Sequence, residues 1–310
     1  MSAADSSALV IGHMNPDTDA ICSAIALAHL NQARGMAVTA VAQGAPNPET
    51  QFVLDRLGLS APEVVSDVAN KQVWLVDFSD LAQGPKGLDS ATALGIVDHH
   101  KLGDVTTPAP LEAWIWPVGC SCTVIKNMYD FFGISIPKDI AGVMLAAILS
   151  DTAMFKSPTT TDADKKAAAA LAPIAGVADV EAFAMDMFKA KSNLAGATMD
   201  ELLHRDYKEF VMDGKKIGIG ALEVVDLSLF DGIKDDLQKA VEQAKTGDHH
   251  SVFLLLTDIL NGNSEMLIAS DDPSLVEKAF GVKPQNNRAW LPGVMSRKKQ
   301  VVPNLQEVLK

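Results

Sequence analysis

The sequence is poor in cysteine, and the cysteines it has are badly placed for disulfides. It contains three in 310 residues: Cys22, Cys120 and Cys122. The number is odd and the closest pair is separated by one residue, a poor framework for structural crosslinks. We therefore expect all three thiols to be reduced and buried, and a zinc site to be excluded because a fourth ligand is missing.

Basic residues are also scarce relative to acidic ones. The chain has 26 Lys and Arg against 39 Asp and Glu, a formal net charge of −13. Wide contact with nucleic acid requires a basic face, so this balance argues against a nucleic-acid partner. A small anionic substrate, held by metal ions and a few local cations, remains compatible with it.

Long apolar runs are absent. No segment reaches membrane-spanning length, and residues 1–7 lack the basic region and apolar core of a signal peptide. We expect no membrane association and a cytoplasmic protein. With 48% hydrophobic and 21% charged residues, the chain is long enough for two globular domains.

Strand-like and helix-like segments alternate through the first half of the chain. Strands are expected at residues 8–12, 37–42, 73–77 and 94–98, and helices at 19–34, 49–57, 121–132, 138–150 and 162–175. This alternation predicts an α/β fold with a parallel sheet and helices on both faces.

A small, polar stretch predicts a hinge after the last of these helices. We expect an N-terminal domain at residues 1–190, a linker at 191–197 and a smaller C-terminal α/β domain with a mixed sheet at 198–310. In the C-terminal domain, Asp213-Gly214 and Asn261-Gly262-Asn263 predict the turns of two hairpins.

One imidazole and two carboxylates, those of His13, Asp17 and Asp19, follow the first expected strand. That edge of an open α/β sheet is where ligands bind. In an extended Asp17-Thr18-Asp19 segment both carboxylates would point the same way, toward two neighbouring cations that relieve their repulsion. Alternatively, the two aspartates only cap the following helix and Asn15-Pro16 forms the turn.

Further acidic and histidine residues directly follow apolar runs. They are Asp77, the tripeptide Asp98-His99-His100, and Asp151. Such positions deliver side chains to the edge of a cleft. Taken singly, the aspartates could close a turn or a helix and the histidines could be solvated. A second copy, Asp248-His249-His250, precedes an expected strand, so we interpret it as a surface loop.

Together these motifs resemble the DHH phosphoesterase superfamily and, within it, the family II, manganese-dependent inorganic pyrophosphatases. The resemblance covers nearly the whole chain. Its other segments are residues 117–123, 150–152, 155–159, the basic run Ser296-Arg297-Lys298-Lys299-Gln300 and residues 301–303.

The resemblance implies a site residue by residue. His13, Asp17 and Asp151 would hold one metal, Asp19 and His99 the other, and Asp77 would bridge them. The positions that bind pyrophosphate and act in catalysis would be His100, Lys208, Arg297 and Lys298, together with Asp77. The family also implies a homodimer formed through the N-terminal domains and a C-terminal domain (DHHA2) that closes over the substrate.

The chemistry of the donors favours particular ions. Imidazole and carboxylate together suit Mn²⁺ or Co²⁺ better than Mg²⁺, which prefers oxygen ligands and retained water. We expect two Mn²⁺ or Co²⁺ per subunit, with further Mg²⁺ arriving with the substrate. A water shared by two such ions can attack phosphorus, while Arg297 suits bidentate phosphate binding and Lys298 supplies a compact charge.

The chain departs from the family pattern after the bridging aspartate. Many relatives carry His-Asn-Glu after the bridging aspartate, whereas this chain reads Phe78-Ser79-Asp80, and Phe78 cannot supply an imidazole.

A DHH exonuclease, oligoribonuclease or other small phosphoesterase is the alternative function, because it would share the N-terminal motifs. Such nucleases carry a glycine-rich, histidine-containing motif in the second half, and we find none here. A metal-binding module without turnover would lack one of the metal ligands, and all six expected ligand positions are present. The chain has no CBS-type insertion, so we do not expect control by nucleotides.

Overall fold

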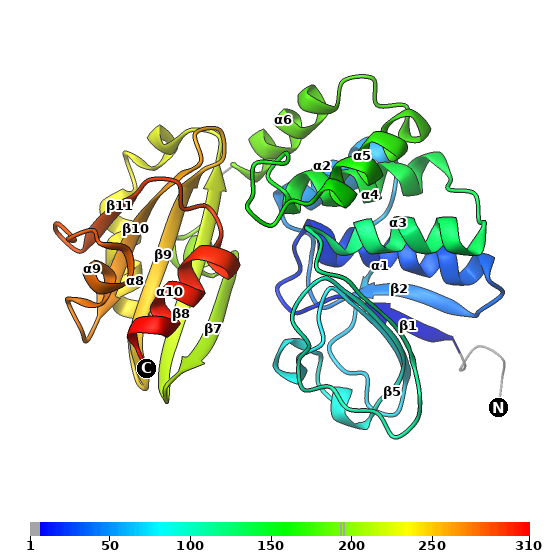
Figure 1. Cartoon of the computed structure of the whole chain (residues 1–310), viewed down its shortest axis with the longest axis horizontal. Coiled ribbons are helices and arrows are strands. Elements are labelled where there is room, and N and C mark those ends of the chain that lie inside the picture. Colours follow the sequence, from blue (N-terminus) through cyan, green and yellow to red (C-terminus); the bar gives the residue numbers. More distant parts are fainter. Residues whose placement is uncertain (1–6, 193, 195) are drawn as a thin grey trace. The chain divides into compact units, whose positions relative to one another are not determined.

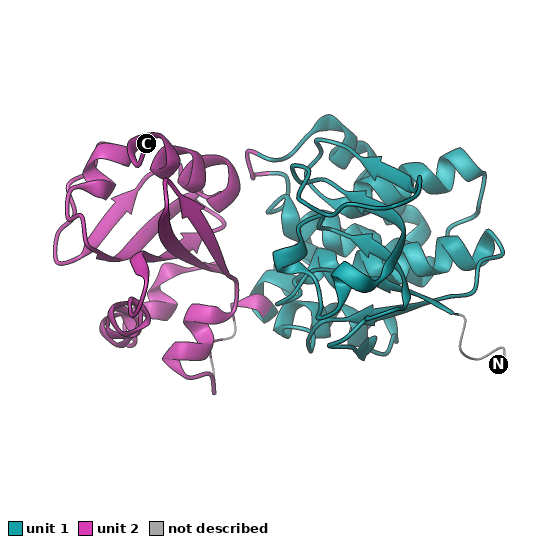
Figure 2. Cartoon of the chain, turned by 90° about the horizontal axis from the view of Figure 1, so that it is seen from below, with its two compact units in different colours: residues 1–155, 159–190 teal, residues 156–158, 191–310 magenta. Residues whose placement is uncertain are grey.

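The computed structural model describes residues 7–192, 194 and 196–310, which form two compact units (Figure 2). The first unit ends at Ala190 and the second begins at Lys191, with Lys156–Pro158 grouped with the second. Residues 193 and 195, within the predicted linker, lie outside the described residues.

A parallel sheet is the centre of the first unit. Within the described residues it has six strands in the order β3-β2-β1-β4-β5-β6. They are β1 (Ala8–Ile11), β2 (Val38–Ala42), β3 (Glu63–Val64), β4 (Gln72–Val76), β5 (Thr92–Asp98) and β6 (Glu112–Ile115). Because β1, β4 and β5 run parallel, their carboxyl ends meet at one edge.

Five described α-helices pack on one another over this sheet, and a sixth follows them in the chain (Figure 1). They are α1 (Thr18–Ala33), α2 (Pro48–Leu57), α3 (Ser121–Phe132), α4 (Lys138–Asp151), α5 (Asp162–Ala175) and α6 (Val180–Lys191). Helix α1 contacts α3 and α4 on one side and β1 and β2 on the other. Helix α4 is buried from Ile140 to Ser150, which explains its uninterrupted apolar sequence.

The other face of the sheet differs from the expected pattern. Its core contains Leu75 and Ile96 from the strands, and Leu88 packs with them from a short 3₁₀ turn. The connection from β4 to β5, residues 77–91, forms the 3₁₀ turns Leu81–Gln83 and Leu88–Ser90 in place of an α-helix. The predicted parallel α/β architecture is confirmed, with α-helices on one face and short turns on the other.

The second unit contains the predicted mixed sheet. Its five described strands follow the order β11-β10-β9-β8-β7, with β8 and β9 parallel and the other pairs antiparallel. The elements are α7 (Met199–His204), β7 (Tyr207–Met212), β8 (Lys215–Val224), α8 (Lys234–Ala244), β9 (His249–Asp258), β10 (Asn263–Ser270), α9 (Leu275–Phe280), β11 (Arg288–Leu291), a π-helical turn (Arg297–Val301) and α10 (Val302–Val308).

The hairpin turns of this unit lie where the sequence predicts them. Asp213 and Gly214 connect β7 to β8 with φ of 47° and 72°, the left-handed pair that a two-residue hairpin turn requires. Gly262 connects β9 to β10, also in the left-handed region. The interpretation of the second Asp-His-His copy as a loop is wrong, because His249 and His250 begin β9.

Crossing a membrane requires a helix that is both long and apolar. Among the described helices none is alone both long and apolar enough for it, although α5 and α6, bent by 94° at their junction, meet the requirement as a pair.

Candidate metal centre

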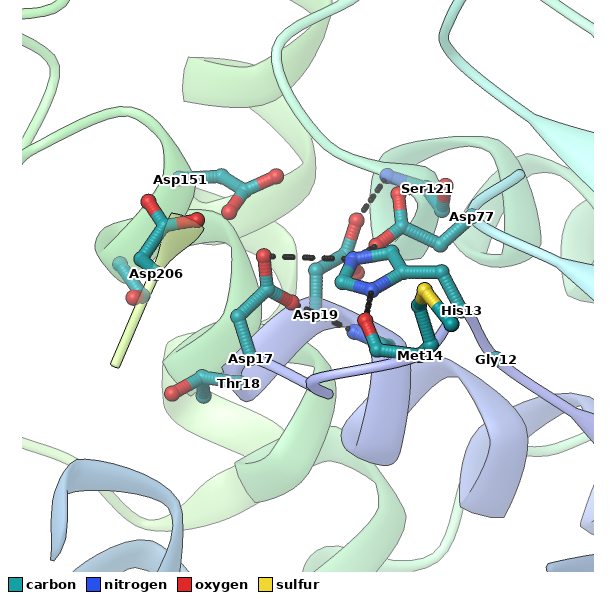
Figure 3. Close-up of polar contacts among 12 residues, drawn as sticks. Gly12, His13, Met14, Asp17, Thr18, Asp19, Asp77, Ser121, Asp151 and Asp206 are labelled. Carbon is teal, nitrogen blue, oxygen red and sulfur yellow. Dashed lines mark hydrogen bonds and ion pairs between the residues drawn. The ribbon is translucent and has the colours of Figure 1, made fainter. Parts of the chain in front are cut away.

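The loop between β1 and α1 brings His13 to the edge of the sheet (Figure 3). Gly12 is required before it, because a Cβ there would lie 2.5 Å from the carbonyl oxygen of Ala20. The His13 ring is buried, and its Nδ1 donates to the Met14 carbonyl oxygen at 2.8 Å. This bond directs Nε2 toward the carboxylates of Asp17, at 3.5 Å, and Asp77, at 3.3 Å.

Asp17 caps the helix and also faces the cluster. Its Oδ1 accepts the backbone N–H of Ala20 at 2.9 Å and so caps α1, while Oδ2 faces His13. Asp19 is not in the extended segment that the alternation argument assumed, because α1 begins at Thr18. Its carboxylate accepts backbone N–H groups at the start of α3, from Ser121 at 2.6 Å and Cys122 at 3.3 Å.

Asp77 occupies the centre of the cluster, directly after β4. Its Oδ2 faces His13 Nε2, and its Oδ1 lies 3.2 Å from His99 Nε2 and accepts the Ser121 hydroxyl at 3.0 Å. The residue is 2% exposed and has a φ of 67°, a left-handed backbone that is rare outside glycine. One carboxylate therefore contacts imidazoles from two different strand ends.

The histidine pair after β5 is held by two different acceptors. His99 Nδ1 donates to the Val118 carbonyl oxygen at 3.0 Å, so Nε2 faces Asp77 and Asp151, the latter at 3.6 Å. His100 Nδ1 donates to Asp98 Oδ1 at 2.9 Å, and its ring is a quarter exposed. The two rings pack edge to face, with their centroids 4.3 Å apart.

Asp151 is the last residue of α4, and its side chain is 19% exposed. The chain then turns through three successive left-handed residues, Ala153, Met154 and Phe155, with φ of 46°, 53° and 65°. Each such residue costs roughly 1–3 kcal/mol and persists only where the surroundings enforce it. Thr152 contributes to that enforcement, because its hydroxyl bonds the Ile148 carbonyl oxygen and accepts the Phe155 N–H.

Three groups of ligand atoms in the described residues overlap by sharing Asp77, and a fourth combines Asp19 with Cys120 and Cys122. Among the described residues, His13 and Asp17 form one group with it, and Asp19, His99 and Asp151 another; the atoms of each lie within 4.8 Å of one another. A third group combines Asp77, His99 and His100. In this grouping Asp151 lies with Asp19 and His99, whereas the resemblance places it with His13 and Asp17.

This donor set fits divalent cations. Neighbouring ligands of an octahedral ion lie roughly 3 Å apart when each bond is about 2.1 Å. The observed separations between His13 or His99 and the carboxylates, 3.2–3.6 Å, are close to that value. Imidazole with carboxylate is also the combination that suits manganese or cobalt.

The electrostatics of the cluster also favour a cation. Burial, reinforced by the charge of Asp77, raises the pKa of Asp19 to about 7. Burial also favours a higher pKa for Asp77, but hydrogen bonds from His13 and His99 outweigh this effect and hold the pKa of Asp77 well below its usual range. Two adjacent buried carboxylates thus compete for positive charge, which a divalent ion supplies to both.

The predicted substrate cations lie in the second unit. Lys208 is in β7, and Arg297 and Lys298 begin the π-helical turn. The Arg297 guanidinium bonds the Asp206 carboxylate and carbonyl oxygen, each at 2.7 Å, and the Ile219 carbonyl oxygen at 3.1 Å. Much of its donor capacity is therefore engaged within the unit.

Two further residues hold side chains of the cluster in place. Asp98 was named only as part of a motif, yet its buried Oδ1 accepts three hydrogen bonds, two from backbone N–H groups and one from His100. Burial opposes its ionisation, but the His100 bond prevails and lowers the pKa of Asp98. Ser121 contacts both Asp19 and Asp77, and its position as first residue of a predicted helix was the available signal.

Comparison with known proteins places this geometry in a family. Residues 7–148 match the model of the DHH family, N-terminal domain, and residues 185–308 match the DHHA2 domain. A protein of Archaeoglobus fulgidus named probable manganese-dependent inorganic pyrophosphatase is 48% identical, covering 96% of this chain and 97% of the relative. The manganese-dependent inorganic pyrophosphatase of Methanocaldococcus jannaschii is 42% identical, covering 96% and 97%.

A solved structure gives the same result. The Methanococcus jannaschii crystal structure assigned to the family II inorganic pyrophosphatases is 41% identical, with a TM-score of 0.87 over 97% of this chain and 98% of that one. The likeness therefore extends through both units.

Proposed function

The chain belongs to the manganese-dependent, family II inorganic pyrophosphatases, and on that basis we propose that it hydrolyses pyrophosphate to two orthophosphates at the cluster around Asp77. The observation that carries the proposal is the position of the Asp77 carboxylate between the imidazoles of His13 and His99. A shared carboxylate of this kind is what a two-ion phosphoryl-transfer site requires.

Each ion would have its own ligands. His13 and Asp17 would hold one, Asp19, His99 and Asp151 the other, and Asp77 both. We propose Mn²⁺ or Co²⁺ at these positions, with Mg²⁺ entering with the substrate. When bound, two such ions lower the pKa of a water between them enough for it to attack phosphorus.

The protein's own groups prepare this chemistry. The carbonyl oxygens of Met14 and Val118 fix the tautomers of His13 and His99, so that both rings present Nε2 to the cluster. His100, anchored by Asp98, would bind or protonate the phosphate oxygens. Lys208, Arg297 and Lys298 would bind the substrate's remaining negative charge when the C-terminal domain closes over it.

We further propose that the protein acts in the cytoplasm as a homodimer formed through N-terminal domains. Strand β6 is an edge of its sheet, and beside it the aromatic cluster of Trp114, Phe131 and Phe132 is left accessible, with Phe131 71% exposed. The net charge of −13 supports an enzyme that does not act on nucleic acid.

The direct test compares substrates. Purified protein with Mn²⁺ should release orthophosphate from pyrophosphate much faster than it cleaves short RNA, polyphosphate or a dinucleotide. Faster cleavage of RNA would overturn the assignment in favour of a DHH exonuclease or oligoribonuclease.

The role of the basic run can be tested separately. Lys298→Ala should weaken pyrophosphate turnover by about 10-fold or more while leaving Mn²⁺ binding intact, because a charge lost from substrate binding does not alter the metal ligands. Lys283→Ala, at an exposed lysine of the same unit, is the control. Equal loss of turnover and Mn²⁺ binding in Lys298→Ala would mean that the run is structural.

A further inference from the structure

Glu49 is a buried carboxylate outside the set of predicted ligands. It lies in the first turn of the ten-residue helix α2, where the helix dipole favours negative charge, and it is 1% exposed. Burying a carboxylate costs several kcal/mol unless hydrogen bonds compensate. The hydrogen-bond donors to the Glu49 carboxylate therefore indicate its role.

Two hydroxyl groups donate to the same oxygen of Glu49. Thr18 Oγ1 and Ser150 Oγ each lie 2.8 Å from Glu49 Oε2. Thr18 is the residue between Asp17 and Asp19, and Ser150 immediately precedes Asp151. A single carboxylate oxygen thus joins the start of α1 to the end of α4.

A second contact strengthens the connection to α1. Thr50, also buried, lies next to Glu49, and its hydroxyl is 3.0 Å from that of Thr18. The Thr50 backbone N–H is in turn bound by Asn47 Oδ1 at 2.9 Å, which caps α2. The first turn of α2 is therefore a fixed support for Thr18.

We propose that Glu49 is a positioning residue of the metal centre, which holds the carboxylates of Asp17, Asp19 and Asp151 in place through Thr18 and Ser150. The inference rests on the ligand set of the proposed function. Four carboxylates at the centre repel one another, and the strained turn after Asp151 favours relaxation of that end of α4. Because both segments are fixed before the ions bind, less conformational free energy is lost on metal binding.

The competing explanation is purely structural. If Glu49 only fills a polar position in the core, its removal lowers thermal stability and leaves the affinity for metal unchanged. Affinity measured on folded protein therefore separates the two roles.

The experiment is a Mn²⁺ titration of the full chain, monitored by the paramagnetic resonance signal of free Mn²⁺ below each variant's melting temperature. Glu49→Ala should bind Mn²⁺ about 10–100-fold more weakly, the range for loss of a group that orients ligands. Glu49→Gln keeps an acceptor oxygen and should recover most of the affinity. Asp55→Ala removes an exposed carboxylate from the same helix and should bind as the wild type does.

Ser150→Ala removes one of the two bonds and tests the route of the effect. It should weaken Mn²⁺ binding less than Glu49→Ala does, and the double variant should be no weaker than Glu49→Ala alone, because both changes act on one contact. Additive losses would contradict the proposed route.

Wild-type Mn²⁺ affinity in Glu49→Ala, with only a lower melting temperature, would overturn the proposal. If Glu49→Ala does not fold, wild-type affinity in Ser150→Ala overturns it equally. A wild-type protein that binds no Mn²⁺ or does not hydrolyse pyrophosphate would contradict the proposed function instead, so the two failures are distinguishable.

Discussion

Asp98 and His100 are joined by a hydrogen bond of 2.9 Å between the buried carboxylate oxygen Oδ1 and ring nitrogen Nδ1. The same oxygen accepts the backbone N–H groups of His99 and His100, which fixes the turn that carries both rings. A carboxylate that orients an imidazole also sets its tautomer and raises its basicity.

Substituting this carboxylate should impair catalysis more than metal binding. We expect Asp98→Asn to reduce kcat by about 10–100-fold, because an amide no longer stabilises the charged His100 ring. Steady-state kinetics and Mn²⁺ titration on the same preparation would test this. The His100→Gln variant should show little further loss when Asp98→Asn is added; independent effects would contradict a shared role.

Asp77 should be indispensable to the metal centre. Asp77→Asn removes a charge shared by both ligand groups, and we expect Mn²⁺ affinity and pyrophosphate turnover to fall together by more than about 100-fold. Asp89→Asn, at an exposed position of the same unit, is the control. Turnover close to wild type in Asp77→Asn would exclude a bridging role.

The exposed aromatic cluster beside β6 predicts the effect of a surface charge. Phe131→Asp should convert a dimer into monomers, because a carboxylate would be buried in an apolar contact. Light scattering during size-exclusion chromatography would measure this. Val211→Asp alters an equally exposed apolar side chain on the edge strand β7 of the second unit, 73% exposed against 71%, and should leave the mass unchanged.

Replacing Phe78 by the histidine that many relatives carry should destabilise the protein. Its ring is fully buried with Ile11 and Leu75 in an apolar core. Phe78→His would bury a polar ring there, and we expect the free energy of unfolding to fall by roughly 2–4 kcal/mol. Urea denaturation would measure the loss. A variant as stable as the wild type would show that the pocket supplies a hydrogen-bond partner.

The three thiols should resist alkylation in the folded protein. Cys22, Cys120 and Cys122 are all fully buried, and burial raises the pKa of Cys122 to about 12. Mass spectrometry after iodoacetamide treatment at pH 8 should show no modification of native protein and three adducts in denaturant. Rapid labelling of the native form would indicate local opening at the start of α3.

The sequence predicted most of the first unit because its signals are local. Apolar runs placed β1, β4 and β5, and α3 and α5 begin and end at the expected residues. The turn at Asp213-Gly214 could also be predicted, because few residue pairs tolerate two consecutive left-handed positions. The element boundaries therefore follow from short-range chemistry.

What the sequence could not supply were contacts between distant segments. The 3.6 Å separation of His99 and Asp151 could not be predicted, because the end of α4 comes beside His99 only once the sheet and helices are packed. Asp98 and Glu49 were missed because their importance depends on which hydrogen-bond donors the fold brings to them. Among the described residues, the expected helix on the second sheet face is missing because the connection from β4 to β5 forms 3₁₀ turns.

The three left-handed residues after Asp151 have a consequence for an isolated fragment. A peptide covering residues 138–160 contains a strong apolar helix and the hydrogen bonds of Thr152, but it lacks the rest of the unit, including Glu49, which accepts the Ser150 hydroxyl. These local bonds alone do not compensate the backbone cost at Ala153, Met154 and Phe155. Such a fragment would form helix in a helix-promoting solvent and leave the turn unformed. The placement of Asp151 is thus a property of the whole unit, and the divalent-ion site comes into existence only on completion of folding.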